Sequence, residues 1–363
     1  MAKLPELCSI QYGYAFDSTC FTEDSTYLPL VRIRDVKRGY SETFYSGNYP
    51  NDYIIDNGSL LVGMDGEFNI ARWKGGNALL NQRVCKITAR KNVDEEYLRF
   101  ALTKALKEIE NQTSFVTVKH LSAKELNRLE IDIPDYRVQI SISGTLTKIE
   151  NIIFTRQQQL QKLDELVKAR FVELFGNPVI NNKGWNVSDL GQLTIKIGSG
   201  ATPKGGKEAY QTDGISLIRS MNVHNGKFEY KELAHISDEQ AARLENVAVE
   251  ENDVLLNITG ASVARSCVVP TNVLPARVNQ HVCIIRCKDS IMPDFVNSLL
   301  IDDNYQDLLW SIAGSGATRE AITKQQVESL QIILPPISKQ EEFSKFINRV
   351  DKSKLLQFFC FPI

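Results

Sequence analysis

Hydrophobic and polar positions along this chain follow one order of predicted elements twice. In each half, short runs of aliphatic residues alternate with glycine-rich turns and predict strands, as at 59–62 and 254–257. Residues 95–109 and 294–312 have apolar positions spaced as on one face of a helix. A loop, a short capped helix and a strand ending in proline follow each of them. The pattern predicts an α/β (α+β) fold with a similar domain in each half.

Several segments of the first half recur in the same order in the second. The residues Asn-Gln-Arg-Val-Cys-Lys-Ile at 81–87 return as Asn-Gln-His-Val-Cys-Ile-Ile at 279–285. The offset rises from about 187 to about 201 residues along the chain, as insertions in surface loops would produce. This period exceeds that of solenoid repeats, so each copy is predicted to be a domain. Further matched segments are 30–32 with 217–219, 57–58 with 252–253, 122–125 with 323–326, and 129–134 with 330–335.

A long helix is predicted between the two copies, because residues 138–175 contain no proline and follow a heptad pattern. Arg156 and Arg170 interrupt its apolar stripe, and Gly176 and Pro178 end the helix. About 38 residues with a rise of about 1.5 Å each give a rod of roughly 57 Å, which needs a partner helix. The residues predicted for the a and d positions are Leu146, Ile149, Ile153, Leu160, Leu163, Val167 and Leu174.

The second copy supplies a shorter partner helix. The heptad ends near Lys354 and Gln357, and the apolar tail 358–363 contains a proline. We predict an antiparallel coiled coil whose second helix is truncated; a short natural C-terminus that folds onto a domain is the alternative. The positions equivalent to Ile142, Leu146 and Ile149 are Phe343, Ile347 and Val350.

Four segments follow from this reading. They are a first domain at 1–134, a central helix at 135–176, a second domain at 177–335 and a shortened helix at 336–363. A truncated antiparallel partner leaves the start of the central helix uncovered. We therefore expect Ile142, Leu146 and Ile149 to be more exposed than Leu163, Val167 and Leu174.

Composition adds limits to this picture. Hydrophobic residues form 43% of the chain and charged residues 24%, which is typical of a globular protein. The net charge of −2 gives no overall support for nucleic-acid binding, although basic patches can lie on an acidic scaffold. With no signal-peptide pattern or long apolar span, a cytoplasmic location is expected. Seven cysteines without a Cys-x-x-Cys pair favour buried, reduced thiols.

Motifs for catalysis are missing from the sequence. The segment 198–207 resembles a phosphate-binding loop, but Ala201 stands where that loop needs glycine and Glu208 where it needs a hydroxyl. There is also no zinc-binding pattern, no Gly-x-Ser-x-Gly and no Asn-Pro-Pro-aromatic segment of adenine methyltransferases. We therefore expect no catalytic residues, no metal and no cofactor in this chain.

Two diverged domains, each followed by a regular long helix, resemble the specificity subunits of Type I restriction–modification systems. The resemblance covers nearly the whole chain, and its weight lies in the order of the segments. The segments that carry it are Gly-Tyr-Ala-Phe at 13–16, Phe-Val-Glu-Leu-Phe-Gly at 171–176, Gly-Ser-Gly-Ala-Thr-Pro at 198–203, Ile-Thr-Gly-Ala-Ser at 258–262 and the Leu-Pro-Pro strand end at 334–336.

The resemblance implies a role in defence against foreign DNA. Each domain would be a target-recognition domain that reads one half of a bipartite double-stranded DNA sequence. The two helices would pair, set the spacing of the half-sites and dock two modification subunits. Those subunits would bind S-adenosylmethionine and methylate adenine, and a restriction subunit would use ATP and Mg²⁺. Because the two copies have diverged, the two half-sites should differ.

Polar and basic residues in equivalent loops of both copies are the candidate DNA contacts, because such side chains read base edges and phosphates. Arg32 and Arg34 alternate along a predicted strand and should share a face. We expect Arg32 and Arg219 to contribute to DNA binding as an equivalent pair. The candidates are Arg32, Arg34, Lys37, Arg38, Glu67, Asn69, Arg72 and Lys119 in the first copy, and Thr202, Lys204, Arg219, Asn222, Lys227, Ser262, Arg265, Thr318, Arg319 and Lys324 in the second.

Three alternatives remain open at this point. The chain could bridge two protein partners without touching DNA, or it could be an enzyme with an unrecognised site. It could also be an inactive, truncated variant of a specificity subunit. Salt-dependent binding of duplex DNA by the complex would favour the recognition role.

Overall fold

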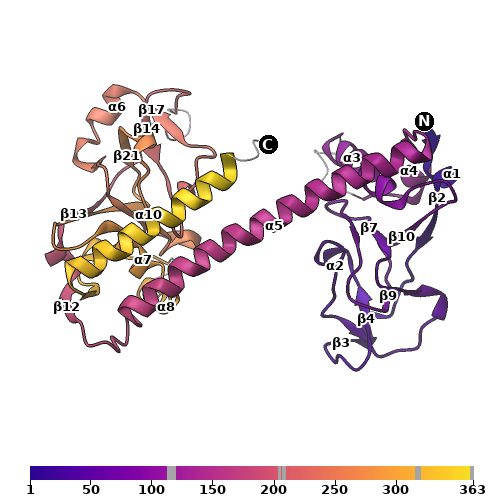
Figure 1. The fold of residues 1–363 in the computed structure, drawn as a ribbon, viewed down its shortest axis with the longest axis horizontal. Helices are drawn as coiled ribbons and strands as arrows, with labels where there is room; N and C mark the ends of the chain where they lie inside the picture. Colours follow the sequence, from indigo (N-terminus) through magenta and orange to yellow (C-terminus); the bar gives the residue numbers. More distant parts are fainter. Residues whose placement is uncertain (113–119, 203–205, 207–209, 315–319, 360–363) are drawn as a thin grey trace. The chain divides into compact units, whose positions relative to one another are not determined.

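The computed structural model describes residues 1–112, 120–202, 206, 210–314 and 320–359. The chain divides into two compact units, Met1–Phe154 and Thr155–Ile363. The division falls inside the long helix α5 (Tyr136–Phe175), so each unit holds one domain and one part of that helix (Figure 1). Among the described helices, none is long and apolar enough to cross a membrane.

The first unit contains two main sheets. One is antiparallel and four-stranded, and the other has five strands, of which β4 and β9 are parallel. The first sheet has the order β2 (Cys8–Tyr12), β10 (Val84–Ala89), β7 (Leu60–Gly63), β8 (Ile70–Arg72), and the second the order β3 (Phe21–Thr22), β5 (Phe44–Tyr45), β4 (Leu28–Val31), β9 (Ala78–Leu80), β6 (Ile54–Ile55).

The second unit repeats this topology. Its antiparallel sheet has the counterpart order, and its second sheet again contains one parallel pair, β14 with β21. The predicted duplication is therefore visible in the strand order of both sheets. The orders are β13 (Thr194–Ser199), β22 (Val282–Cys287), β19 (Val254–Asn257), β20 (Ser266–Val268), and β17 (Ala234–Ile236), β14 (Ile215–Ile218), β21 (Ala276–Val278), β18 (Ala248–Val249).

Helices cover the antiparallel sheet in each unit and bury the main cores. In the first unit these are α1 (Leu4–Leu7), α3 (Glu95–Gln112) and α4 (Ala123–Arg128), with the small pair β1 (Ala2–Lys3) and β11 (Glu130–Ile131). In the second they are α7 (Pro293–Leu300), α8 (Asp303–Gly314), α9 (Lys324–Glu328) and α10 (Ile337–Phe359), with β12 (Asn186–Asp189) and β23 (Gln331–Leu334). The smaller elements are α2 (Ile33–Arg38), α6 (Asp238–Ala242), β15 (Val223–His224) and β16 (Lys227–Phe228).

The predicted single helix over 294–312 is wrong, because α7 ends at Leu300 and α8 begins at Asp303. The side chain of Asp302 accepts hydrogen bonds from the backbone N–H groups of Asn304 at 3.0 Å and Tyr305 at 3.4 Å. An Asp that caps a new helix start stabilises the break, since it satisfies N–H groups that have no partner inside the helix. Sequence periodicity alone does not show such a break.

Both predicted capping boxes are confirmed. The Ser122 hydroxyl accepts from the Glu125 N–H at 3.2 Å, and the Glu125 carboxylate accepts from the Ser122 N–H at 2.7 Å. Thr323 and Gln326 make the same two bonds at 3.2 and 2.8 Å. Each box starts the short helix before the proline-terminated strand, α4 or α9.

A buried glutamine fixes the start of each long helix to its domain. The Gln139 Oε1 accepts the Asp94 N–H at 2.9 Å, and its Nε2 donates to the Pro134 carbonyl at 2.8 Å. In the second unit Gln340 accepts from the Met292 N–H at 2.9 Å and donates to the carbonyl of the strand-ending proline at 2.8 Å. Both amide groups are buried and bonded, so the joint has one preferred geometry.

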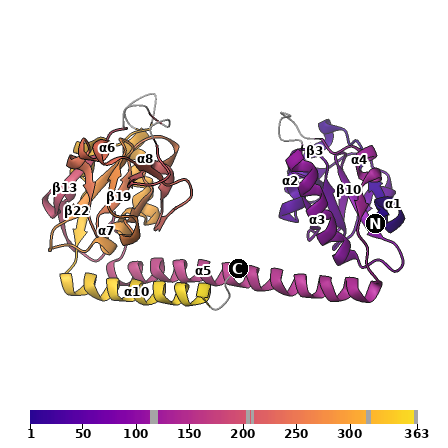
Figure 2. The same ribbon diagram turned by 90° about the horizontal axis from the view of Figure 1, so that it is seen from above.

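Helix α10 runs antiparallel to the part of α5 that belongs to the second unit (Figure 2). Arg170 pairs with Glu342 near the start of α10, and Lys354 pairs with Asp164 at 2.8 Å near its end. Residues late in α10 thus contact residues earlier in α5, as expected for antiparallel helices. Phe343 and Val350 are buried, and the other positions on these facing segments that were predicted to pair are half-buried: Leu160, Leu163, Val167, Leu174 and Ile347.

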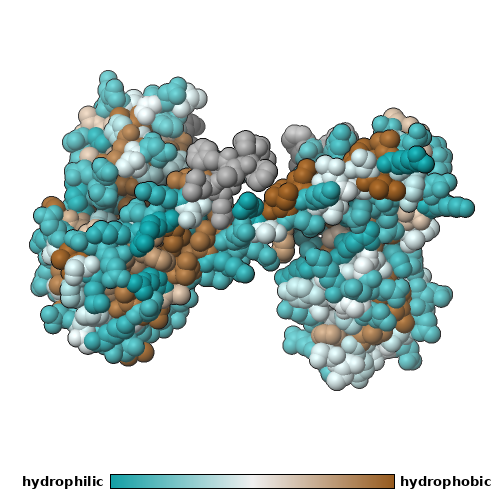
Figure 3. Space-filling view, in the orientation of Figure 1, coloured by the Kyte–Doolittle hydropathy of each residue, from teal (hydrophilic) through white to brown (hydrophobic). Residues whose placement is uncertain are grey.

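The start of α5 presents apolar side chains at the surface (Figure 3). Ile142, Ile149 and Ile153 are 38%, 47% and 40% exposed, so the expected contrast with the half-buried Leu163, Val167 and Leu174 holds for Ile142 and Ile149. It does not hold for Leu146, which is half-buried because it lines a groove with side chains of α3.

The six cysteines in the described part of the chain are free thiols, as expected. Cys8, Cys85, Cys267 and Cys283 are buried, whereas Cys20 and Cys287 are half-buried. Burial raises the pKa of the Cys85 and Cys283 thiols to about 12. These thiols therefore act as small apolar groups in the sheets.

Candidate nucleic-acid interface

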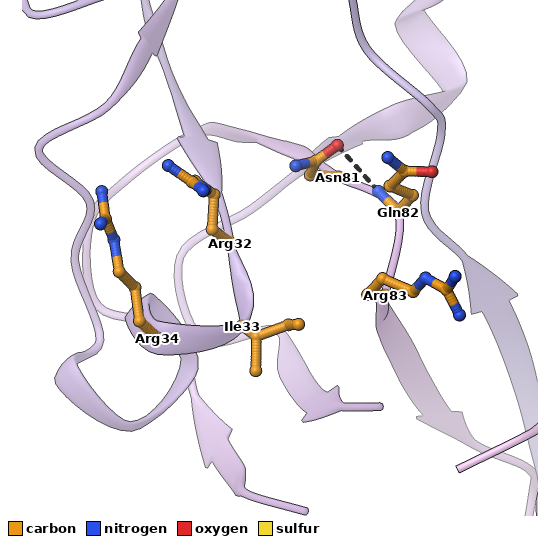
Figure 4. Close-up of a pocket in the computed structure, with 6 residues that line it drawn as sticks. All are labelled: Arg32, Ile33, Arg34, Asn81, Gln82 and Arg83. Atoms are coloured by element: carbon orange, nitrogen blue, oxygen red, sulfur yellow. Dashed lines mark hydrogen bonds between the residues drawn. The ribbon is translucent and has the colours of Figure 1, made fainter. Parts of the chain in front are cut away.

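Two loops of the first unit line an open pocket of about 320 Å³. One loop joins β4 to α2, and the other is the turn between β9 and β10. Figure 4 shows the Arg32 and Arg34 side chains on one side of this pocket and those of Gln82 and Arg83 on the other. The Arg32 and Arg34 guanidinium groups favour an anionic or hydrogen-bond-accepting ligand, whereas that of Arg83 points away from them.

The prediction that Arg32 and Arg34 share the face of a strand is wrong. Strand β4 ends at Val31, and Arg32 is the extended residue that precedes α2. The Asp35 carboxylate accepts the Arg32 N–H at 2.9 Å and so stabilises a helix start at this point. Arg34 consequently lies in the first helical turn, where its Nη2 donates to the Thr43 hydroxyl at 3.2 Å.

The turn Asn81-Gln82-Arg83 is a part of this pocket that was not predicted from the sequence. The Asn81 side-chain oxygen accepts the Gln82 N–H at 2.9 Å, and the Asn81 carbonyl accepts the Val84 N–H at 3.2 Å. Arg83 has a φ of 70°, a conformation that closes tight turns. Asn81 is buried, so the turn is anchored while Gln82 and Arg83 are exposed. The signal that could have found it was a polar triplet repeated between apolar strands.

Glycine lets a preceding strand pass directly against this turn. A Cβ on Gly13 would clash with the Asn81 carbonyl, and a Cβ on Gly200 would clash with the Val278 carbonyl. The Gly13 N–H donates to the Val84 carbonyl at 3.0 Å, and the Gly200 N–H donates to the Asn279 carbonyl at 3.1 Å. Glycine is therefore required at positions 13 and 200, because two backbones approach too closely there to leave room for a Cβ.

The second unit holds Arg219 in the same way as the first unit holds Arg32. The Asn222 side chain accepts the Arg219 N–H at 3.0 Å, as Asp35 does for Arg32. The Arg219 guanidinium lies over the Tyr210 ring at 5.3 Å, and that of Arg32 lies over an aromatic ring, Phe21, at 5.9 Å. Arg219 also donates to the carbonyl of Glu232.

The counterpart turn is Asn279-Gln280-His281. The Asn279 side-chain oxygen accepts the His281 N–H at 3.1 Å, and its carbonyl accepts the Val282 N–H at 3.3 Å. Gln280 is exposed and accepts a hydrogen bond from the Thr202 hydroxyl. Thr202 is thus one predicted contact that lies beside the turn.

Two predicted contacts do not fit a ligand surface. Asn222 is fully buried, and its Nδ2 donates to the Glu229 carbonyl at 2.9 Å, because it stabilises the turn after Arg219. Arg72 donates to Glu95 at 2.8 Å and also to Glu96, which neutralises its charge between β8 and α3. Both residues hold the fold together.

The other candidates are mostly exposed. Lys37 lies 4.0 Å from Glu67, Arg38 lies 3.7 Å from Glu42, and Lys324 lies 3.5 Å from Glu328. Such surface pairs contribute little and leave the cations accessible. Lys227 is exposed, and Asn69, Ser262 and Arg265 are half-buried. Lys119, Lys204, Thr318 and Arg319 lie outside the described residues. Within the described ranges, no cluster of His, Cys, Asp or Glu has the arrangement of a metal site.

Comparison with known proteins agrees with this duplicated arrangement. Residues 1–165 and 182–357 match the family described as Type I restriction modification DNA specificity domain. The Type I restriction enzyme EcoBI specificity subunit of Escherichia coli is 27% identical in an alignment that covers 96% of this chain and 78% of that protein. The MjaVIII specificity subunit of Methanocaldococcus jannaschii is 19% identical, with coverages of 90% and 79%.

Solved structures show the same fold. The Type I S subunit from M. genitalium superposes with a TM-score of 0.60 at 13% identity, covering 98% of this chain and 90% of that one. A chain from a study of complex assembly and conformational transition of the type I R-M system gives 0.51 at 18% identity, with coverages of 98% and 92%. With two matching domains that together span most of its length, the chain belongs to the Type I restriction–modification specificity subunit family.

Proposed function

We propose that this chain is the DNA-recognition subunit of a Type I restriction–modification complex, and that each domain reads one half of a bipartite target. The observation that carries this proposal is the duplicated site. Both units place an arginine over an aromatic ring beside an Asn-Gln turn whose glutamine is exposed. Two equivalent readers with different side chains suit two different half-sites.

The chemistry would be performed by other subunits. Modification subunits, two by our expectation, would dock on the helices and bind S-adenosylmethionine, while a restriction subunit would use ATP and Mg²⁺. We assign no catalytic residue and no cofactor to this chain, and expect it to act in the cytoplasm. The type I R-M structure with a TM-score of 0.51 comes from a study of complex assembly, which supports the proposed partners.

The function can be tested by co-expression with the modification subunit of the same operon, followed by genome-wide mapping of methylated adenines. We expect a split motif with two different halves. An assembled complex that methylates DNA at no defined motif and binds duplex DNA without sequence preference would contradict target reading. An assembled complex that does not bind DNA would favour a protein scaffold or an inactive truncated variant.

We expect the double variant Arg32→Ala/Arg219→Ala to bind target DNA at least about tenfold more weakly in the assembled complex, because it removes one cation from each site. The slope of log affinity against log salt should also fall by about 0.9 for each phosphate that the variant no longer neutralises. The control Lys107→Ala/Lys288→Ala removes the same charge from exposed positions on α3 and just beyond the end of β22 that lies away from the turn. Unchanged affinity of the arginine variant would contradict a role for this pair.

A further inference from the structure

We propose that the two Asn-Gln turns set target specificity, with Arg83 and His281 as the residues that make the half-sites differ. Arg83 is assigned to a G·C pair in the first half-site. Gln82 and Gln280 are assigned to the same kind of base in both half-sites. This inference rests on the proposed function, and it names the side chains that do the reading.

The backbone places Arg83 and His281 at equivalent points of the two units. The Arg83 carbonyl accepts the Met64 N–H at 2.8 Å, and the His281 carbonyl accepts the Ile258 N–H at 3.0 Å. The next hydrogen bond in each unit also corresponds, from Leu121 to the Met64 carbonyl at 2.7 Å and from Ile322 to the Ile258 carbonyl at 2.8 Å. Sequence differences at these turns are therefore differences at one and the same position of the fold.

Neighbouring side chains orient Arg83 in the first unit. Its Nε lies 3.6 Å from the Asp65 carboxylate, and its Nη1 lies 3.2 Å from the ring nitrogens of His120. Asp65 and His120 face each other across an isolated antiparallel bridge, where the imidazole contacts the carboxylate. The Arg83 side chain is still 52% exposed. The guanidinium is thus held from one side and open on the other.

The second unit replaces the whole cluster. The equivalent bridge joins Thr259 to Ala321, so the positions of Asp65 and His120 carry a hydroxyl and a methyl group. There the Thr259 hydroxyl lies 2.5 Å from the Nδ1 of His281. An acidic partner accompanies the arginine, and two neutral groups, the Thr259 hydroxyl and the Gln280 amide at 3.1 Å, accompany the histidine. Between the two units, both the third residue of the turn and the side chains that contact it therefore differ.

The chemistry of these side chains explains the assignment. A guanidinium carries parallel N–H donors and binds the O6 and N7 acceptors of guanine in the major groove. A neutral imidazole offers one donor and one acceptor and cannot make that two-donor contact. A carboxamide pairs with the N6 and N7 of adenine, which is the base expected opposite Gln82 and Gln280. The diverged pair at 83 and 281 thus predicts one base pair that differs between the half-sites.

A purely structural role does not account for the cluster. Asp65 and Arg83 have side chains that are 25% and 52% exposed, and such surface pairs contribute little to stability. Gln82 is also exposed, and neither Gln82 nor Arg83 is needed to fill a core. A structural role would therefore change unfolding, whereas a reading role would change the target sequence.

The test introduces the histidine and the hydroxyl of the second cluster into the first domain of the full chain, in complex with its modification subunit. The variants are Arg83→His with Asp65→Thr, and Arg83→Met alone, which keeps a long side chain but removes its N–H donors. We expect both to lose the preference for G·C at one position of one half-site by about ten- to a hundredfold, measured by mapping methylated adenines. The other half-site should not change. Arg90→His, an exposed arginine just beyond the opposite end of β10, is the matched control and should keep the motif.

Each failure has a distinct signature. An unaltered motif in the Arg83 variants, or equal weakening on all sequences, would overturn the assignment of Arg83 while the wild-type motif still supports DNA recognition. A wild-type complex that neither binds nor methylates a split motif would instead overturn the proposed function. If the double variant loses cooperative unfolding, Arg83→Met decides the question, because it leaves Asp65 and its partner His120 in place.

Discussion

Replacing Phe343 by alanine should lower the free energy of unfolding of the second unit by about 3–5 kcal/mol. The Phe343 ring is fully buried in α10 and lies 5.6 Å from the ring of Phe171 and 5.4 Å from that of Phe175. Phe295 of α7 completes the cluster, 4.8 Å from Phe175. Truncation would leave a cavity between α5, α7 and α10 and remove the edge-to-face contacts of Phe343 with Phe171 and Phe175.

The urea dependence of amide hydrogen exchange in α7 measures this effect locally, which matters because the chain has two units that need not unfold together. Phe154→Ala is the matched control. It makes the same chemical change at a side chain that is 59% exposed on α5, and should change stability by less than about 0.5 kcal/mol. Equal effects of the two variants would show that the aromatic cluster does not stabilise the helix pair.

We expect Asp253→Ala to destabilise the second unit by about 3–5 kcal/mol, because it leaves the Arg286 guanidinium without its buried partner and with only the largely exposed Glu250 as an acidic partner. Asp253 is 0% exposed and accepts from the Arg286 Nε at 2.8 Å and Nη2 at 2.9 Å. It also accepts the Glu250 N–H at 2.7 Å, so the turn before β19 loses a bond as well.

Two comparisons make this second result specific. Lys324→Ala breaks an exposed pair with Glu328 and should cost no more than about 0.5 kcal/mol. The double variant Asp253→Leu/Arg286→Met removes both charges and should recover much of the loss, since an apolar pair often replaces a buried ion pair at little cost. Denaturant unfolding, again followed by exchange of β19 amides, gives all three values. A double variant as unstable as Asp253→Ala would assign the loss to the turn.

Local signals in the sequence were enough to predict much of this fold. The matched segments predicted the duplication, and the proline-free heptad predicted α5 within a residue or two of its observed ends. The capping boxes were predicted because Ser122 and Thr323 stand three residues before Glu125 and Gln326. Each of these features depends on residues close together in the chain, where spacing carries the information.

Side-chain contacts that do not follow a recognised capping pattern were not predicted, even where the partners are only a few residues apart. Val31 ends its strand because Asp35 caps the following helix, and Asn222 is buried because Glu229 and Lys231 supply acceptors for its amide. Arginine and asparagine are both common in exposed loops, so Arg34 and Asn222 were predicted to face a ligand. The turn at Gln82 and Arg83 was missed for the opposite reason, since its repetition was read only as a sign of common ancestry.

The buried glutamines at the helix starts make each domain an exchangeable part. Gln139 and Gln340 each make one bond within the short stretches 134–139 and 335–340, and one bond to a backbone N–H of their own domain, that of Asp94 or Met292. A genetic crossover inside either stretch would join a foreign domain to the resident helix and still keep both amide bonds. New target sequences could thus arise by replacing one domain, without the slower search for compensating mutations at the joint.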